Sequence, residues 1–320
     1  MPTLSPEAVA VLCCPACHST LEQRAGGYAC TGCGRTFPIV HGIPVLIDEE
    51  QSLFNHADFA DQRPTTWLPT SQLRRTVSRF LPSLSRNMKA HENYARLREL
   101  LLAEGSGGSR PRVLVIGGSR VGQGMEEFAN DPRLDLVESD VSFGPRTTLI
   151  CDAHQLPLAD GSVDAVVIQG VLQALVDPPA SVAEMHRVLR PGGYVYAETP
   201  FMQQVCVARF DFTRYTHLGH RRLFRDFEEV QSGPVCGPGM ALAWSYQYFL
   251  LSFFKGPRTR TFVKGFTRVT AFWLKYFDFL LIDRPGGIDA ASGVYFLGRR
   301  SDSPLSDEEL IAQYRGAVSL

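Results

Sequence analysis

The chain has 320 residues, 44% of them hydrophobic, and its 32 Lys and Arg nearly balance its 33 Asp and Glu. This length predicts one large domain with room for a small one. A net charge of −1 excludes a strong overall field for nucleic acid. The first residues contain no basic segment followed by a long apolar one, so we expect no signal peptide. Four of the eight cysteines have metal-ligand spacing and the rest are scattered, which indicates a cytoplasmic protein.

Four cysteines near the N-terminus have the spacing C-x2-C-x12-C-x2-C, and these are Cys14, Cys17, Cys30 and Cys33. Four thiolates can close a tetrahedral shell with no open position, which suits a structural Zn²⁺. A segment of about 45 residues buries little core, so the metal would supply its folding energy. We therefore predict a zinc-ribbon module over residues 1–48. Four unrelated buried thiols, or a redox pair, fit the doubled spacing less well.

The motifs CPAC, CTGCGRTFPI and HGIPVLI follow one another between Leu12 and Ile47. They resemble the small zinc-ribbon family whose members activate tRNA and protein methyltransferases. The resemblance implies a structural role or contact with a protein partner or a second copy, and no chemistry by the ribbon itself. It also implies an apolar surface that docks on the larger domain, formed by Phe37, Ile39, Val40, Ile43, Val45 and Leu46.

Residues 49–86 contain three prolines, many polar residues and little periodicity. They predict an irregular linker with one short helix near Leu73–Phe80. Apolar residues at i, i+3 and i+7 then predict a helix within 87–104. We expect the large domain to span residues 87–300, followed by a tail over 301–320.

The sequence RVLVIGGSRVGQG, which begins at Arg112, predicts a buried parallel strand over 113–116 and a glycine-rich turn. A short helix is expected around 125–130. Such a turn lets backbone N–H groups approach a nucleotide-like ligand. A second strand over 134–137 leads to Asp140, about 20 positions after the turn, where an acidic residue commonly binds ribose hydroxyls. An ordinary turn residue at the strand end is the alternative.

Residues 151–199 predict a polar turn, a strand, an amphipathic helix, a glycine turn and another strand. Asp152 and Ala153 follow a predicted third strand, where a carboxylate can accept from an adenine amino group and a backbone N–H can reach a ring nitrogen. Gln169 ends the fourth strand, over 163–168, at the edge where open α/β sheets bind ligands. The motif RPGG at Arg190 is expected to end the helix.

The motifs GGSRVGQG, DAHQLP, VDAVV, RVLRPGG and YVYAETP, with Asp140 between the first two, resemble class I S-adenosylmethionine-dependent methyltransferases of the type 11 subgroup. The resemblance implies a Rossmann-like α/β fold: a seven-stranded, mostly parallel sheet with helices on both faces. It implies S-adenosyl-L-methionine as cofactor. It further implies that Gly117, Gly118 and Ser119 face the methionine part of the cofactor, in a turn completed by Gly122. Asp140 would bind the ribose, and Asp152 and Ala153 the adenine. Gln169 would lie at the substrate-side rim.

Two departures from that family leave catalysis open. Val115 stands where an acidic residue is usual, and Leu172-Gln173-Ala174 replaces the frequent Leu-Glu-His. The alternative is a catalytically weakened protein of the same fold that acts as a binding module through its ribbon. An NAD-dependent oxidoreductase would use the same glycine turn but gives no reason for RVLRPGG.

Methyl transfer from a sulfonium is an in-line displacement, which needs alignment more than it needs a base. The polar and aromatic segment after the fifth strand is expected to meet the acceptor, a small-molecule, sugar or lipid-type compound. Its catalytic candidates are Asp211, Tyr215 and His217. A structural ion pair between Asp211 and Arg214 is the competing interpretation.

Two apolar stretches of 14 residues each, 241–254 and 269–282, flank a basic segment. Both are shorter than the roughly 20 residues that span a bilayer. We expect them to form helices that cover the sheet and the pocket. A sharper hypothesis is an interfacial surface that makes peripheral membrane contact and receives a lipid-linked acceptor. Residues 293–299 predict the final strand.

Overall fold

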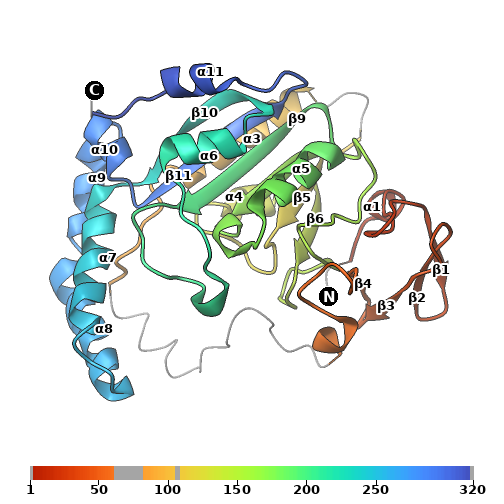
Figure 1. Ribbon diagram of the computed structural model, residues 1–320, viewed down its shortest axis with the longest axis horizontal. Coiled ribbons are helices and arrows are strands. Elements are labelled where there is room, and N and C mark those ends of the chain that lie inside the picture. The colour runs from red at the N-terminus through yellow and green to blue at the C-terminus, as the bar shows by residue number, and fades with distance from the viewer. Residues whose placement is uncertain (1–2, 61–81, 105–108, 318–320) are drawn as a thin grey trace.

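The computed structural model describes residues 3–60, 82–104 and 109–317, and its centre is a twisted sheet covered by helices on both faces (Figure 1). The strands of the large domain are β5 (Arg112–Ile116), β6 (Asp135–Asp140), β7 (Leu149–Cys151), β8 (Val163–Gln169), β9 (Leu189–Pro200), β10 (Phe227–Cys236) and β11 (Gly293–Arg300). Their spatial order is β7-β6-β5-β8-β9-β11-β10, and β11 is antiparallel to both neighbours. The predicted seven-stranded, mostly parallel sheet with helices on both faces is confirmed.

The alternation of side chains along β5 explains why its sequence is apolar without interruption. Val113 and Val115 share a buried cluster with helices α3 (Ala90–Glu104) and α4 (Glu126–Ala129). Leu114 and Ile116 belong to the cluster on the opposite face, which includes residues of α5 (Pro178–Val188). A parallel strand that is covered on both faces must be apolar at every position.

The helices begin and end at recognisable signals. The Asp177 side chain accepts a hydrogen bond from the Ala180 N–H and caps α5, which starts with Pro178. Strand β9 begins at Leu189, directly after α5, so the motif RPGG starts a strand instead of forming a separate turn. The pairing register with β8 shifts there, and Gly192 supports the irregularity with a φ of 72°.

The N-terminal module consists of helix α1 (Pro6–Val9) and four short strands. These are β1 (Leu21–Arg24), β2 (Gly27–Cys30), β3 (Thr36–Val40) and β4 (Ile43–Leu46), each antiparallel to the next. Strand β4 then pairs in parallel with β7, through Val45 with Ile150 and Leu46 with Cys151. The ribbon therefore extends the central sheet, and among the described residues the two form one eleven-stranded sheet.

The apolar face predicted for the ribbon packs against the large domain of the same chain. Phe37 and Leu46 share a buried cluster with Leu149 and Leu156. A bridge between Leu12 and Leu158 adds backbone contact at the start of the module.

After the ribbon, residues 49–60 run along the carboxyl edge of the sheet and contain the short 3-10 helix η1 (His56–Phe59). The short helix predicted near Leu73–Phe80 lies outside the described residues. Two further 3-10 turns, η2 (Leu172–Ala174) and η3 (Ala208–Phe210), follow β8 and β9.

The helices after β9 and β10 lie at the other end of the sheet (Figure 1). Helix α6 (His217–Leu223) packs on β11. Helices α7 (Pro238–Leu251) and α8 (Pro257–Ala271) pack together, followed by η4 (Leu274–Phe277), α9 (Asp278–Leu281), α10 (Pro285–Asp289) and, after β11, α11 (Asp307–Ala312). Within the described ranges, none of the helices combines the length and apolar character that crossing a membrane requires.

Candidate functional site

A cavity of about 620 Å³ opens at the carboxyl ends of β5, β6, β7 and β8. The cavity is lined by a residue at or directly after the end of each strand, namely Gly117 after β5, Asp140 in β6, Asp152 after β7 and Gln169 in β8. The site lies where the strand order reverses between β5 and β8, which is the crevice that open α/β sheets use for ligands. Its volume suits a small molecule of cofactor size.

The glycine turn after β5 brings the backbone to the floor of the cavity. Gly117 has a φ of 78°, and a Cβ there would overlap the Val171 side chain. The Gly118 N–H donates to the Ser139 carbonyl at 2.8 Å, and a Cβ would lie only 3.0 Å from the Val115 carbonyl oxygen. Gly117 lines the cavity, whereas Gly118 holds the turn against β6 and is not among the described lining residues.

Asp140 ends β6 and presents a carboxylate to the cavity. The Ser119 N–H donates to its Oδ2 at 3.2 Å, and burial raises the pKa of the carboxyl. Ser119, for which the resemblance implies contact with the methionine part of a cofactor, is buried, contacts Asp140 through its N–H and is not among the described lining residues. The Ser119 side chain and the backbone N–H groups of Val141 and Ser142 also interact with this carboxylate.

Asp152 follows β7 and is held from both sides. Its Oδ2 accepts from the Ser52 hydroxyl at 2.5 Å, and its Oδ1 accepts from the His154 N–H at 3.0 Å and lies 2.6 Å from His154 Nδ1. Burial raises the pKa of Asp152, but these hydrogen bonds outweigh burial and lower it overall. The Asp177 N–H donates to His154 Nε2 at 3.1 Å, so both ring nitrogens of His154 are engaged.

Gln169 is fixed by a buried polar network behind the cavity. Its Nε2 donates to Glu198 Oε2 at 2.9 Å, and Glu198 also accepts from Asn87 and from the Tyr196 hydroxyl. Burial raises the pKa of Glu198. Gly122 is not among the described lining residues, and a Cβ there would overlap the Gln169 amide. The role of this glycine is therefore to leave room for Gln169.

Two side-chain acceptors of the lining have no protein partner among the described residues. They are Oε1 of Gln155 and Oε1 of Gln169, both buried. A buried acceptor without a donor costs about 1–3 kcal/mol. The Gln169 Oε1 lies beside Gly122, where a Cβ would overlap it.

The three predicted catalytic residues are engaged elsewhere, and none of them is among the described lining residues. Asp211 forms an ion pair with Arg214 and accepts from the Cys206 N–H at 2.6 Å, so it fixes its own loop. His217 is buried against β10, with Nε2 2.9 Å from the Ser232 hydroxyl, and burial lowers its pKa. Tyr215 is half-buried beside the ring of His220.

The same loop nevertheless reaches the cavity through two apolar side chains, Val207 and Phe210. Opposite them stand Leu53 and Phe54 from the segment after the ribbon, and the rings of Phe54 and Phe210 are 6.3 Å apart between centroids. The sequence prediction missed this wall because residues 49–60 show no periodicity. It also placed residues 241–282 over the pocket. They contribute no described lining residue, because they follow β10 at the far end of the sheet.

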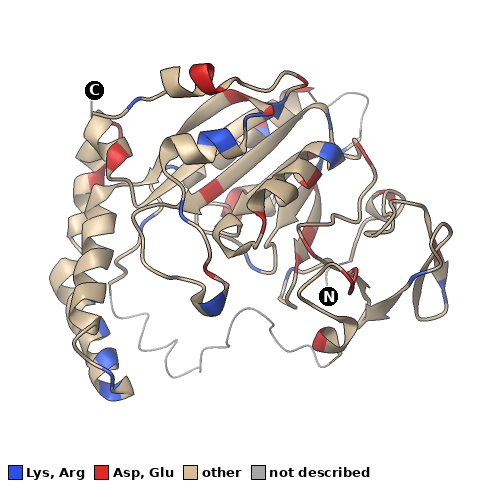
Figure 2. Ribbon diagram, viewed as in Figure 1, with Lys and Arg blue, Asp and Glu red and all other residues tan. Residues whose placement is uncertain are grey.

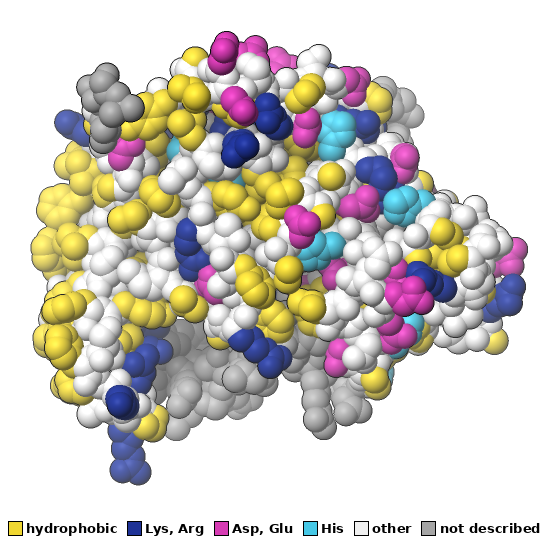
Figure 3. Space-filling model, in the orientation of Figure 1, with side chains coloured by type: hydrophobic (Ala, Val, Ile, Leu, Met, Phe, Trp, Pro, Cys, Tyr) yellow, Lys and Arg dark blue, Asp and Glu magenta, His cyan; other side chains and the backbone are white. Residues whose placement is uncertain are grey.

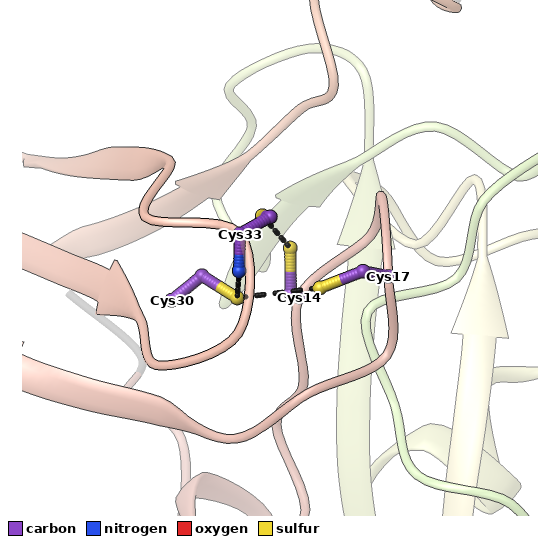
Figure 4. Close-up of side chains that lie close together, drawn as sticks. All are labelled: Cys14, Cys17, Cys30 and Cys33. Carbon is purple, nitrogen blue, oxygen red and sulfur yellow. Dashed lines mark hydrogen bonds between the residues drawn. The ribbon is translucent and has the colours of Figure 1, made fainter.

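The four N-terminal cysteines form a compact cluster on two facing turns of the ribbon (Figure 4). Their sulfur atoms all lie within 4.8 Å of one another, with 3.7 Å between Cys14 and Cys33 and 3.4 Å between Cys17 and Cys30. A tetrahedral zinc with Zn–S bonds of about 2.3 Å needs sulfur separations of about 3.8 Å. The Gly32 N–H donates to Cys30 Sγ at 3.4 Å, which stabilises thiolate charge. The residues present therefore fit a structural Zn²⁺.

Comparison with known proteins identifies the central part of the chain. Residues 121–197 match the family model of a methyltransferase domain. An uncharacterized 37.1 kDa protein in a transposon of Streptomyces fradiae is 49% identical over 89 residues, which are 28% of this chain and 23% of that protein. An uncharacterized chloroplastic methyltransferase of Arabidopsis thaliana is 39% identical over 74 residues, 23% of this chain and 18% of its own length. The chain thus spans less than a quarter of the length of either relative.

Among solved structures, phosphoethanolamine N-methyltransferase 2 of Haemonchus contortus in complex with S-adenosyl-L-methionine is similar to this chain. It has 14% sequence identity and a TM-score of 0.40, and the match covers 65% of this chain and 53% of that one. The segment matched by the methyltransferase-domain model, residues 121–197, contains the lining residues Asp140, Asp152 and Gln169.

Proposed function

We propose that the chain binds S-adenosyl-L-methionine in the cavity and transfers its methyl group to a small-molecule, sugar or lipid-type acceptor. The observation that carries this proposal is the pair of carboxylates, Asp140 and Asp152, at adjacent strand ends in one cavity of cofactor size. The match of residues 121–197 to a methyltransferase domain supports the reaction class.

The lining offers partners for each part of that cofactor. Asp140 would accept from the two ribose hydroxyls. Asp152 would accept from the adenine amino group, and the Ala153 N–H would donate to a ring nitrogen. Gly117 would let the methionine part approach the backbone. When bound, the cofactor supplies a methyl group activated by a sulfonium.

The work left to the protein is to align the acceptor and exclude water. Phe54 and Phe210 lie next to each other in the cavity lining, and we propose that Gln169, held by Glu198, lies on the acceptor side. His154 is unsuited to act as a base because Asp152 and the Asp177 N–H occupy both ring nitrogens. We infer that the acceptor brings a nucleophile that loses its proton without a dedicated base.

The acceptor we propose has an apolar part. Met202, Val205 and Phe212 are exposed on the loop that carries Val207 and Phe210, so apolar side chains continue from the cavity to the surface. Named relatives of this chain include a malonyl-[acyl-carrier protein] O-methyltransferase from Xylella fastidiosa, 27% identical over 189 residues, which cover 54% of this chain and 61% of that enzyme.

We further propose that Cys14, Cys17, Cys30 and Cys33 hold one structural Zn²⁺ per chain. The closed tetrahedral arrangement leaves no open position for a substrate, so the metal would stabilise the ribbon and take no part in methyl transfer.

Titration calorimetry of the full chain with S-adenosyl-L-methionine, its demethylated product and NAD⁺ tests the proposal. We expect saturable binding of the first two and none of NAD⁺. Binding of NAD⁺ alone, or of none, overturns the assignment of the cavity. Release of the demethylated product in the presence of amphiphilic acceptors then separates an enzyme from a binding module, which would bind the cofactor without turnover.

A further inference from the structure

One face of the helical segment from α8 to α9 carries a row of exposed apolar side chains. They are spaced four, three, four, four and three residues apart, which keeps them on one side of successive helical turns. Their exposed fractions run from 45% for Phe266 to 73% for Phe262. We call this row the outer stripe, and it consists of Phe262, Phe266, Val269, Trp273, Phe277 and Leu280.

The outer stripe is separate from the face that holds the helix in place. Val263, Thr267 and Ala271 form the buried face of α8, and the Gln247 Nε2 of α7 donates to the Thr267 hydroxyl at 2.8 Å. Helix α8 therefore has two apolar faces, and its contact with α7 uses only the inner one. Burial within the fold gives no reason for the aromatic residues of the outer stripe.

Helix α7 contributes two further exposed apolar side chains, Leu242 and Phe249, and Phe253 follows just after the helix. In the space-filling view, hydrophobic side chains gather along the side of the molecule where Figure 1 places α7, α8 and α9 (Figure 3). An exposed apolar patch of this extent marks an interaction site in a folded protein.

The charge beside the α8 part of the stripe is positive. Residues 230–277 contain six Lys or Arg and no Asp or Glu. Beyond them, Asp278 is buried and the exposed Asp283 forms an ion pair with Lys89. Lys255, Arg258 and Lys264 are exposed at and just beyond the turn between α7 and α8, and Figure 2 shows basic residues at that end of the helical pair. An apolar stripe with an adjoining patch of uncompensated positive charge is complementary to an anionic, amphiphilic surface.

We propose that the outer stripe and this basic turn dock the protein onto an anionic lipid bilayer. Trp and Phe side chains would enter the interfacial region, and the cations would lie among acidic headgroups. A second copy fits less well, because residues 230–277 of both copies would bring only positive charge to a shared interface. This inference is independent of methyl transfer.

Docking there would place the bilayer beside the loop that reaches the cavity. The Tyr248 hydroxyl of α7 donates to the Val205 carbonyl at 2.9 Å, and the Gln204 Nε2 donates to the Ser245 hydroxyl at 3.1 Å. The same loop supplies Val207 and Phe210 to the cavity lining. The membrane face and the cavity are thus joined by one short, directly bonded segment.

Co-sedimentation of the full chain with vesicles tests this inference. We expect binding to vesicles of phosphatidylcholine mixed with phosphatidylglycerol, weakened by added salt, and little binding to phosphatidylcholine alone. The double variant Phe262→Ser/Phe266→Ser should lower the partition coefficient about tenfold or more, and Lys255→Gln/Arg258→Gln also about tenfold. Intrinsic fluorescence should shift to shorter wavelength on binding, and Trp273→Phe should remove most of that shift.

Ile311→Ser, an equally exposed apolar residue on α11, is the matched control and should bind as the parent does. Absence of binding to the mixed vesicles overturns the inference, as does binding that the Phe double variant leaves unchanged. A dimer in solution that the Phe double variant converts to monomer would assign the stripe to a second copy instead. Calorimetry with S-adenosyl-L-methionine reports on the cavity separately, so the two proposals can fail independently.

Discussion

The ribbon lies at one end of the sheet and the helical pair α7 and α8 at the other, and they differ in whether their apolar residues are buried. The ribbon turns Phe37, Val45 and Leu46 inward and continues the sheet through β4. In the helical pair after β10, α7 and α8 pack against each other through their inner faces, and the outer stripe is exposed to solvent. Apolar content alone therefore does not predict burial. One end has backbone pairing with the sheet and a cluster of four cysteines, whereas the other has a helical pair with mostly basic charged residues.

Breaking the metal site should have the largest effect on this contrast. Cys14→Ser removes one of four predicted zinc ligands, and small metal sites supply about 10 kcal/mol or more to the folding of such modules. We expect loss of bound zinc and a marked fall in Tm, measured by metal analysis and thermal unfolding. Cys206→Ser changes an exposed cysteine outside the cluster and should alter neither.

Truncation of matched apolar side chains compares the two ends directly. Leu46→Ala opens a cavity beneath β4 and should cost about 2–5 kcal/mol in the free energy of unfolding. Phe262→Ala, on the outer stripe, should change it by no more than about 0.5 kcal/mol. Denaturant unfolding measures both. If both variants lost the same free energy of unfolding, the outer stripe would be part of the core and could not bind a membrane.

In the cavity between the two ends of the sheet, a variant should change the affinity for S-adenosyl-L-methionine and leave stability unchanged. Asp140→Asn weakens the acceptor proposed for the ribose hydroxyls and should raise the Kd for S-adenosyl-L-methionine about 10- to 100-fold. Asp160→Asn, an exposed carboxylate, should leave the Kd unchanged. Calorimetry on both variants gives the answer, and an unchanged Kd for Asp140→Asn would place the ribose elsewhere.

The smallest expected effect is the loss of folding stability at acid pH that His220 causes. His220 of α6 is fully buried, its Nε2 has no partner among the described residues, and burial lowers its pKa to about 3. The unfolded chain therefore binds more protons than the folded one below the ordinary pKa of 6.5. Stability is present above pH 6.5 and is lost as pH falls, at up to about 1.4 kcal/mol per pH unit.

His220→Phe keeps a ring against Phe224 and removes the titrating group. The pKa of His220 is about 3 in the folded chain and 6.5 in the unfolded chain. Between these two values we expect the unfolding free energy of the variant to fall less steeply with decreasing pH than that of the parent. Urea unfolding at a series of pH values measures the two slopes. Parallel slopes would assign the acid sensitivity to other groups.

The elements that the sequence predicted well are those with a strong local pattern. Alternating and continuous apolar runs predicted β5, β8 and β11, and the cysteine spacing predicted the cluster of four cysteines. Asp140 and Asp152 were placed at the cavity because the carboxyl ends of parallel strands share one edge.

The contacts that the sequence did not reveal are long-range ones. The Ser52 hydroxyl donates to Asp152, 100 residues away in sequence, and the ring of Phe54 packs near that of Phe210 in the cavity lining. His217 and Asp211 have residue types suited to catalysis, yet local hydrogen bonds hold both away from the cavity. No local pattern distinguishes a loop carboxylate that fixes its own backbone from one that faces a substrate.

The parallel pairing of β4 with β7 has a consequence for how the chain assembles during synthesis. Val45 and Ile150 are paired although they lie on the order of 100 residues apart, so this contact forms late and slowly. The ribbon is complete long before β7 leaves the ribosome, because domains fold from the N-terminus as they emerge. We therefore expect zinc supplied at the start of refolding to speed recovery of the native sheet more than zinc added late, since a ribbon already held by its metal offers β7 a finished strand to join.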